Sequence, residues 1–266
     1  PTTTSKPNTP AVTTKKEVPE KNSEGDNGKN PNFEETLALI PQKKGVYGLY
    51  IKDLTLEKEF SINPTGNFYG ASLYKILVGG AVYELISQGK LSLNYEYIYT
   101  ADDVTDGTGS IKNQAIGTKY SVDELLNYLF RDSDNIAQNI LTRNIGEKEI
   151  FDFYEKYTNS QASPRKFYPT GETSPKEVSE IFINLFNNET WPKTLRKDFF
   201  NRLSATSFDD RISLGLESSR IFAHKIGTFS NGIFHDCGIV FDSKYSYPIV
   251  VCLMSKQADL NEFLEV

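Results

Sequence analysis

The sequence predicts an α/β (α+β) fold, in which an antiparallel five-stranded sheet is flanked by helices. Two observations support this prediction. Segments with strand-like alternation lie at both ends of the ordered part of the chain, and capped helical segments fill the middle, from about 72 to 205. Because strands at the two ends need partners, we expect them to pair in one sheet with an all-helical insertion between them.

The domain boundaries follow from composition. The chain has 266 residues, of which 38% are hydrophobic, and this suits one domain with a sizeable core. Residues 1–32 are rich in proline and threonine and lack aromatic side chains, which predicts a disordered stalk or linker, or else an unstructured leader. We therefore expect the folded domain over residues 33–266.

The individual elements are predicted from alternation, caps and breakers. The strands are expected at Gly45–Asp53, Glu57–Asn63, Ile221–Lys225, Gly232–Phe241 and Tyr247–Met254. Helices are expected after Asn32 as far as Pro41, over Ser72–Gln88, from Ser121 to Arg131, over Asn135–Asn144, and from Ser174 onwards. Gly79 and Gly80 cost a helix about 1 kcal/mol each relative to alanine, so another element should pack very close to the helix that contains them.

Three segments fit the pattern Ser-x-x-Lys, and their contexts separate them. The pair Ser87–Lys90 straddles a helix-ending glycine, and the pair Ser163–Lys166 contains a proline. Only Ser72 and Lys75 lie at a helix start, where a spacing of three places the hydroxyl and the amine on one face. The free N–H groups and positive dipole of a helix start also favour a developing oxyanion. Ser72 is therefore the candidate nucleophile, with Lys75 as its activating amine.

Two further motifs follow in order. Ser133-Asp134-Asn135 occurs once, in a break between two predicted helices, and Lys225-Ile226-Gly227 lies on a predicted strand. The order Ser-x-x-Lys, Ser-Asp-Asn, Lys-x-Gly is the set typical of class A β-lactamases and penicillin-binding proteins, in which threonine is usual at the middle of the third motif.

The chain resembles this β-lactamase and penicillin-binding serine hydrolase superfamily over about residues 33–266. The segments that carry the resemblance are Gly70–Ile76, Gly89–Leu93, Arg131–Asn135, Asp209–Ile212 and His224–Thr228. The resemblance implies a β-lactamase/transpeptidase-like fold and an acyl-enzyme mechanism.

The resemblance also implies roles for particular residues. Ser72 would attack the carbonyl, and Lys75 would accept its proton in the neutral form, helped by the nearby charge of Lys225. Ser133 would relay that proton to the leaving nitrogen. The backbone N–H groups of Ser72 and Thr228 would form the oxyanion hole.

Substrate contacts are implied in the same way. Asn135, Gly227 and Thr228 would contact the substrate, Asn135 through its side-chain amide. Arg211 matches an arginine that some family members aim at the substrate carboxylate, or it ties a loop.

The chain departs from the family pattern in two places. Ile226 replaces the usual threonine or serine, so a hydroxyl that holds the substrate carboxylate is missing, and Thr228 or Arg211 would have to compensate. No Glu-x-x-Leu-Asn loop lies between the second motif and the helix that starts at Ser174. Glu155 and Glu172 are the replacement candidates, although Glu172 also suits a structural role. Without such a glutamate, deacylation should be slow.

These observations predict a serine hydrolase that acts on β-lactams or D-alanyl-type peptides and esters. The alternatives are a peptidase or esterase of the same fold that ignores β-lactams, and a penicillin-binding or cell-wall-binding domain without turnover. We expect an extracytoplasmic monomer with a small-molecule or peptidoglycan-type substrate.

Other partners are not expected. The net charge of −6 argues against nucleic acid. No apolar run spans a bilayer and the chain begins at Pro1, so a membrane contact is expected only through an anchor ahead of that residue. No cofactor is implied. His235 and Cys237 share a strand face, but a zinc site needs more ligands, so we expect no metal.

The two cysteines are expected to face each other. If the closing hairpin pairs Phe241 with Pro248, then Cys237 lies directly opposite Cys252, with the Cα atoms about 4.5 Å apart. That separation is near the lower limit for a disulfide, and buried thiols pack as small hydrophobic groups. We therefore expect adjacent but unbonded thiols, with a cross-strand disulfide as the alternative.

Overall fold

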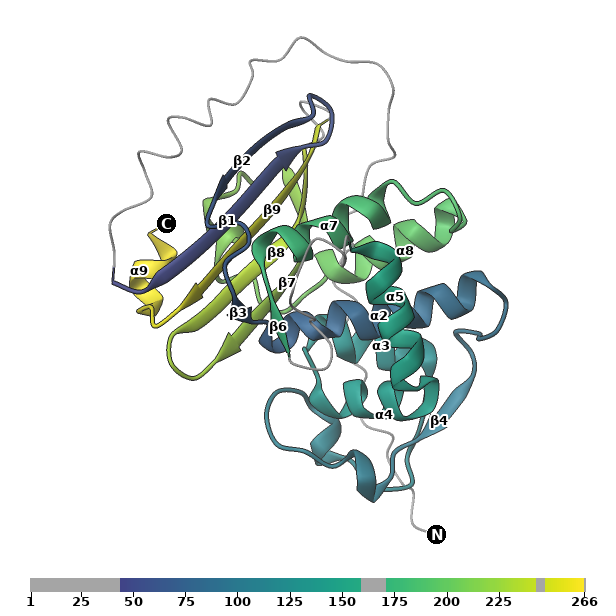
Figure 1. The fold of residues 1–266 in the computed structure, drawn as a ribbon. Helices are drawn as coiled ribbons and strands as arrows, with labels where there is room; N and C mark the ends of the chain where they lie inside the picture. The colour runs from purple at the N-terminus through teal and green to yellow at the C-terminus, as the bar shows by residue number, and fades with distance from the viewer. Residues whose placement is uncertain (1–43, 159–170, 243–246, 266) are drawn as a thin grey trace.

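The computed structural model describes residues 44–158, 171–242 and 247–265. The predicted stalk and the predicted helix before Pro41 lie outside these residues. Within the described residues, a sheet forms one side of the molecule and the helices form the other (Figure 1). No helix among them is both apolar enough and long enough to cross a bilayer.

The main sheet has five antiparallel strands in the order β2-β1-β9-β8-β7. Their bounds are β1 Val46–Asp53, β2 Lys58–Ile62, β7 Arg220–Phe229, β8 Ile233–Asp242 and β9 Tyr247–Lys256. The strands from the two ends of the chain meet where β1 pairs with β9. The predicted sheet is thus confirmed, and β7 forms one edge of it.

The middle of the chain is mainly helical, as predicted, although the helices over Glu147–Tyr157 and Lys193–Ser204 were not expected. The helices are α2 Tyr74–Ser87, α3 Val122–Arg131, α4 Asn135–Ile145, α5 Glu147–Tyr157, α7 Pro175–Phe186 and α8 Lys193–Ser204, with a short 3₁₀ turn at Ala71–Leu73 ahead of α2. The same region also contains short strands, which the prediction of an all-helical insertion did not include. They are β4 Glu96–Ile98, β5 Lys119–Ser121 and β6 Glu172–Thr173, the last paired with β3 Phe68–Tyr69.

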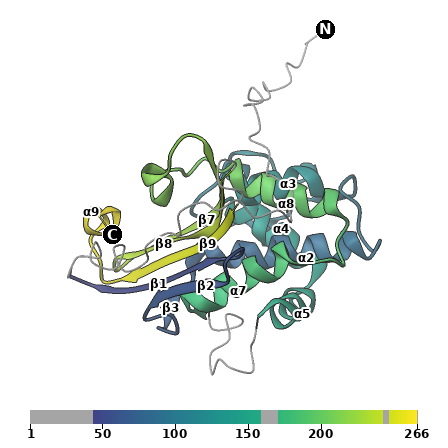
Figure 2. The ribbon, with the colours of Figure 1, turned by 90° about the horizontal axis from the view of Figure 1, so that it is seen from above.

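Alternation along β9 explains the layers. Cys252 and Met254 point into the main core beneath the helices, where α7 packs on β1, β8 and β9. Leu253 points to the opposite face and packs near Phe263 of α9 Leu260–Leu264. Figure 2 shows the sheet edge-on between these layers. Successive side chains of a strand alternate between faces, so one strand serves both layers.

Helix α2 runs through the middle of the helical layer, and its two glycines allow this. A Cβ added at Gly79 would lie 2.1 Å from the ring of Phe130, and one added at Gly80 would lie 2.1 Å from the ring of Phe153. The predicted close packing is therefore confirmed: α3 and α5 each place an aromatic ring directly on the helix backbone. We expect these contacts to offset the unfavourable helix propensity of glycine.

The predicted capping signals form in two different ways. Ser121 and Glu124 make a full capping box at the start of α3. Ser174 accepts a hydrogen bond from the N–H of Glu177, but the Glu177 carboxylate instead accepts hydrogen bonds from Tyr154 and Thr173. The second capping signal thus also ties α7 to α5 and to β6.

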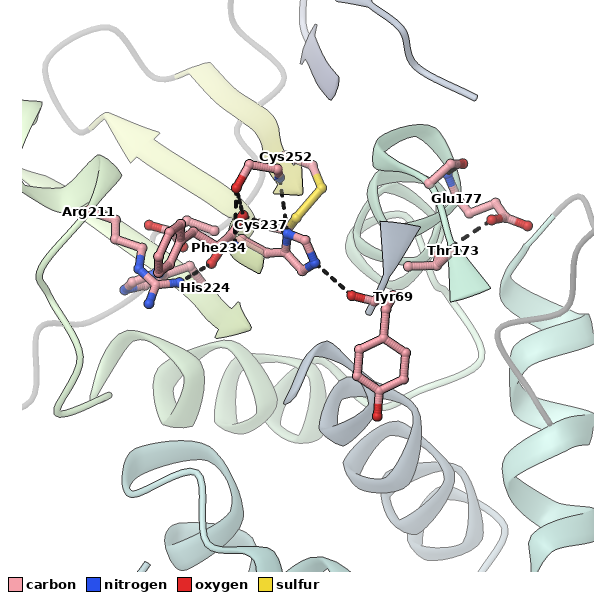
Figure 3. The surroundings of a disulfide bond; sticks show 12 residues. Tyr69, Thr173, Glu177, Arg211, His224, Phe234, Cys237 and Cys252 are labelled. Carbon is pink, nitrogen blue, oxygen red and sulfur yellow. Dashed lines mark hydrogen bonds and ion pairs between the residues drawn. A yellow bond between two sulfur atoms is a disulfide. The ribbon is translucent and has the colours of Figure 1, made fainter. Parts of the chain in front are cut away.

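The prediction for the cysteines was half right. The register pairs Phe241 with Pro248 and places Cys237 opposite Cys252, as expected. The two residues nevertheless form a disulfide, with the Cα atoms 3.9 Å apart, so the expectation of free thiols was wrong (Figure 3). Direct opposition in a closely spaced pair brings the two sulfur atoms within bonding reach, and burial of both residues does not prevent the bond.

Candidate active site

Ser72 lies in the 3₁₀ turn that leads into α2, as the sequence predicted for a nucleophile at a helix start. The residue before it, Ala71, has a φ of +48°, a left-handed conformation that is uncommon outside glycine. The turn is held by hydrogen bonds from the Gly70 N–H to the Gly171 carbonyl and from the Leu73 N–H to the Gly70 carbonyl. Strained backbone of this kind persists only where its surroundings enforce it.

Lys75 is buried one turn later, with 1% of its surface exposed. Its amine lies 3.2 Å from Ser72 Oγ and 2.7 Å from Asn135 Oδ1. Burial lowers the pKa of Lys75 to about 8, despite the opposing charge of Asp134. The amine beside the serine is therefore neutral in about a tenth of the molecules at pH 7 and in about half of them at pH 8.

The second motif begins α4 and brings three polar side chains together. Asp134 caps the helix by accepting hydrogen bonds from the N–H groups of Ile136 and Ala137. Ser133, whose φ is +50°, is thereby turned toward the sheet. Asn135 lines the cavity and donates to the Asp106 carbonyl, while its Oδ1 faces Lys75.

Lys225 approaches the same region from β7 and is fully buried. Its amine donates to Ser133 Oγ at 2.9 Å and to the Ile226 carbonyl at 3.0 Å. Burial lowers the pKa of Lys225 well below its ordinary value, and the charges of Lys75 and Arg211 lower it further. The charge of Lys75 thus helps to lower the pKa of Lys225, whereas the lowered pKa of Lys75 is due to burial and not to the charge of Lys225 as expected.

Gly227, the glycine of the third motif, is needed because β7 passes very close to the turn that carries Ser72. A Cβ added at Gly227 would lie 2.9 Å from the Gly70 carbonyl oxygen and 3.4 Å from Leu73. Strand β7 therefore passes directly against the turn that carries Ser72. Ile226 points to the other face and is buried, with 7% of its surface exposed.

Arg211 is buried beneath β7 rather than exposed in the cavity. Its guanidinium donates to the carbonyl oxygens of Gly227 and His235 and to the hydroxyl of Thr228. Of the residues in this network, Thr228 lines the cavity. Arg211 thus ties the loop before β7 to the sheet and reaches the cavity through the Thr228 hydroxyl.

The two histidines are engaged within the protein. His235 bonds to the Tyr69 carbonyl oxygen at 2.8 Å through Nε2, and burial lowers its pKa to about 4. His224 contacts Asp236 at 2.6 Å through Nδ1 and Asp209 at 3.3 Å through Nε2. In the part of the chain that the structure describes, no cluster of histidine, cysteine and acidic residues could hold a metal ion.

A cavity of about 630 Å³ opens over Ser72. Its walls include Lys75, Asn135 and Thr228, which the sequence indicated. They also include Tyr69, Phe229 and the loop 105–108, which the sequence analysis missed because neither exposed aromatic rings nor a loop of this kind gives a motif.

The two glutamates considered for deacylation lie elsewhere. Glu155 is exposed on α5, and Glu172 pairs with Tyr69 in the β3–β6 ladder. Among the described residues that line the cavity, Asp106 is the one acidic side chain. It belongs to the loop that accepts the hydrogen bond from Asn135.

This fold and this site together define a β-lactamase-like serine hydrolase. The chain belongs to the β-lactamase enzyme family, whose family model matches residues 32–264.

Individual relatives have low sequence identity to this chain, but the alignments cover most of both proteins. β-Lactamase VEB-1 of Pseudomonas aeruginosa is 26% identical over 226 residues, which cover 76% of this chain and 75% of that protein. β-Lactamase 1 of Bacillus cereus is also 26% identical, over 222 residues that cover 79% of this chain and 71% of that protein.

Solved structures share the fold. PBP-A matches with a TM-score of 0.78 at 18% identity, over 88% of this chain and 90% of that one. An ancestral class A β-lactamase matches with a TM-score of 0.77 at 21% identity, over 87% of this chain and 94% of that one.

Proposed function

We propose that this hydrolase forms an acyl-enzyme at Ser72 with β-lactams or D-alanyl-type peptides and esters, and that it releases the acyl group slowly. The observation that carries the proposal is the buried Lys75 amine, 3.2 Å from a serine hydroxyl that opens onto a cavity. A serine needs such a base, because its hydroxyl is a weak nucleophile at its own pKa.

The first step is attack by Ser72 on the substrate carbonyl. The neutral amine of Lys75 accepts the hydroxyl proton as Oγ bonds to the carbonyl carbon, and the carbonyl oxygen becomes an oxyanion. The backbone N–H groups of Ser72 and Thr228 would stabilise that oxygen. Thr228 lies on β7, an edge strand of the described sheet, and the outward N–H groups of an edge strand are open to a ligand, which supports the role.

The second step breaks the amide or ester bond. The leaving nitrogen of a β-lactam needs a proton, and Ser133 would supply it from its hydroxyl. The Lys225 amine, 2.9 Å from Ser133 Oγ, stabilises negative charge on that oxygen during transfer, and the proton taken by Lys75 restores the hydroxyl.

Substrate orientation would come from Asn135 and Thr228. One N–H of the Asn135 amide donates to the Asp106 carbonyl, which leaves the other N–H for a substrate carbonyl. The Thr228 hydroxyl accepts from Arg211, so its own hydrogen is free to donate to a substrate carboxylate. Arg211 would act through Thr228 and in this way compensate for the missing hydroxyl at Ile226.

Slow deacylation is supported by the place of the two candidate glutamates, since Asp106 is the one acidic side chain of the described cavity lining. Hydrolysis of an acyl-enzyme needs a base for water, and Glu155 and Glu172 are both absent from the described cavity lining. The segment 159–170 contains neither aspartate nor glutamate. A structural neighbour, a single-residue mutant of PBP-A, is solved as an acyl-enzyme complex with penicillin G.

The test is intact mass after addition of benzylpenicillin, followed over time. We expect an adduct on the parent chain that persists for many minutes, and no adduct on Ser72→Ala. Ser87→Ala is the matched control, because it alters another Ser-x-x-Lys serine outside the described cavity lining. A transient adduct with rapid turnover would refute slow deacylation, and no adduct at all would refute the proposal for β-lactams.

A peptidase or esterase activity that spares β-lactams is the second candidate. The buried Ile226 favours a substrate without a carboxylate, because one hydrogen bond to a carboxylate such as that of a β-lactam is missing at this position. Turnover of a simple ester, measured on the same preparation, distinguishes the two. Ester turnover without a penicillin adduct supports this alternative.

The disulfide supports an extracytoplasmic location, because such bonds persist mainly in oxidising compartments. We propose that the protein works there on small molecules or peptidoglycan-type peptides. Thiol titration of denatured protein prepared from cell surfaces tests this: two free thiols would argue against it.

A further inference from the structure

Two aromatic rings stand exposed at the cavity over Ser72, and the proposed chemistry uses neither. Tyr69 is 45% exposed and Phe229 is 57% exposed, and both line the cavity. Their ring centroids lie 5.2 Å apart at an angle of 55°. We call these two residues the aromatic pair. Exposed aromatic rings at the wall of a cavity offer an apolar contact surface for a ligand.

Tyr69 is held firmly in place. Its carbonyl oxygen bonds to Nε2 of His235, and its backbone pairs with Glu172 in the β3–β6 ladder. The ring points away from the disulfide (Figure 3). It packs on Gly171, where an added Cβ would lie 2.8 Å from the ring. The ring is therefore positioned before any ligand arrives, and little conformational entropy is lost on binding.

The position of Phe229 on β7 indicates which part of the substrate the aromatic pair faces. Strand β7 carries Lys225, then Thr228, then Phe229. Lys225 and Ser133 serve the leaving group, and Thr228 supplies the oxyanion N–H. Phe229 lies one residue beyond Thr228, on the side away from Lys225. A substrate that lies along β7 with its leaving group toward Lys225 would therefore place its acyl half against the pair.

The remainder of the cavity wall is polar and contrasts with the pair. The loop 105–108 and the residues Gln138 and Asn139 of α4 line the cavity with Tyr69 and Phe229. An acyl group with an amide and an apolar ring matches this arrangement, because the amide finds polar partners while the ring packs on the aromatic pair.

We propose that Tyr69 and Phe229 form a specificity subsite for an aromatic or bulky apolar substituent on the acyl side of the substrate. This inference rests on the proposed acylation of Ser72. It defines the substrate class more narrowly: acyl donors with a ring react faster than matched donors without one.

The experiment compares two penicillins that differ only in the ring. Benzylpenicillin carries a phenylacetamido group, and 6-acetamidopenicillanic acid keeps the amide but lacks the phenyl ring. The second-order acylation rate constant is measured by intact mass for the parent chain, Phe229→Ala and Tyr69→Leu. Tyr95→Ala is the matched control, since Tyr95 is 56% exposed and pairs with Tyr97 at 5.2 Å outside the described cavity lining.

We expect Phe229→Ala and Tyr69→Leu to slow acylation by benzylpenicillin about five- to tenfold, the range that an aromatic contact supplies. Acylation by the acetamido compound should change less than about twofold, and Tyr95→Ala should change neither rate. Equal losses with both compounds, or no loss with benzylpenicillin, would overturn the subsite while leaving acylation of Ser72 intact. No adduct on the parent chain with either compound would overturn the proposed β-lactam acylation, and the subsite with it.

Discussion

The raised pKa of the buried His224 predicts how the stability of the fold depends on pH. Burial alone lowers the pKa of this histidine, but the charges of Asp236 and Asp209 outweigh burial and raise it from 6.5 to about 9. The ring also stacks on Phe222 at 4.1 Å. The folded protein thus holds this proton more tightly than the unfolded chain does. The difference between the two pKa values corresponds to about 3 kcal/mol of folding free energy.

The sign follows from the raised pKa. The contribution of His224 is complete below pH 6.5, decreases as the pH rises, and is lost above about pH 9. Between pH 6 and pH 8, the linkage relation predicts a loss of about 2 kcal/mol from this residue. His235 acts in the opposite sense, because its pKa is lowered to about 4. Its effect on stability is lost as the pH falls from 6.5 toward 4, so it causes no loss of stability as the pH rises from 6 to 8.

The assay is urea unfolding of the parent and of His224→Asn at several pH values. The variant removes the titrating ring but retains an amide donor for Asp236. Lys75 and Lys225 remain in both proteins, so their titration cancels in the comparison. The stability gap between the two proteins should narrow by about 2 kcal/mol from pH 6 to pH 8. A gap that stays constant would show that His224 is not a protonated partner of Asp236.

Two further predictions concern the reaction. Because Lys75 has a pKa of about 8, the acylation rate constant should rise about tenfold per pH unit below pH 8 and level off above it. A rate constant that is independent of pH from 6 to 9 would rule out this amine as the base. Thr228→Val should slow acylation by benzylpenicillin about tenfold but leave the rate of acylation by benzylpenicillin methyl ester unchanged, because only the free acid has a carboxylate that can accept from the hydroxyl. Equal losses with both compounds would contradict this role of Thr228.

The sequence predicted the parts of the site that depend on local spacing. Ser72 and Lys75 share a face because three residues make almost one helical turn, and Ser133 lies directly before a helix whose N-cap is Asp134. The sheet followed from alternation at both ends of the chain, including the register that opposes Cys237 and Cys252.

The parts that were missed depend on tertiary contacts. Helices α5 and α8 were not predicted, because their caps, Gly146 and Pro192, offer no side-chain signal. The burial of Arg211 under β7 depends on a loop folding back on the sheet, which no spacing indicates. The opposition of Cys237 and Cys252 followed from the predicted register, but the expectation that they stay unbonded was wrong, because it depended on an inter-strand separation that the sequence does not determine.

The departure from the family pattern at Ile226 is best understood from the alternation of β7. Lys225 and Gly227 face the helices, where one meets Ser133 and the other lets the Ser72 turn approach. Ile226 and Thr228 face the opposite side, where Arg211 lies. Loss of the hydroxyl at Ile226 therefore leaves the groups that move protons in place. We expect it to shift recognition of a substrate carboxylate onto the single hydroxyl of Thr228.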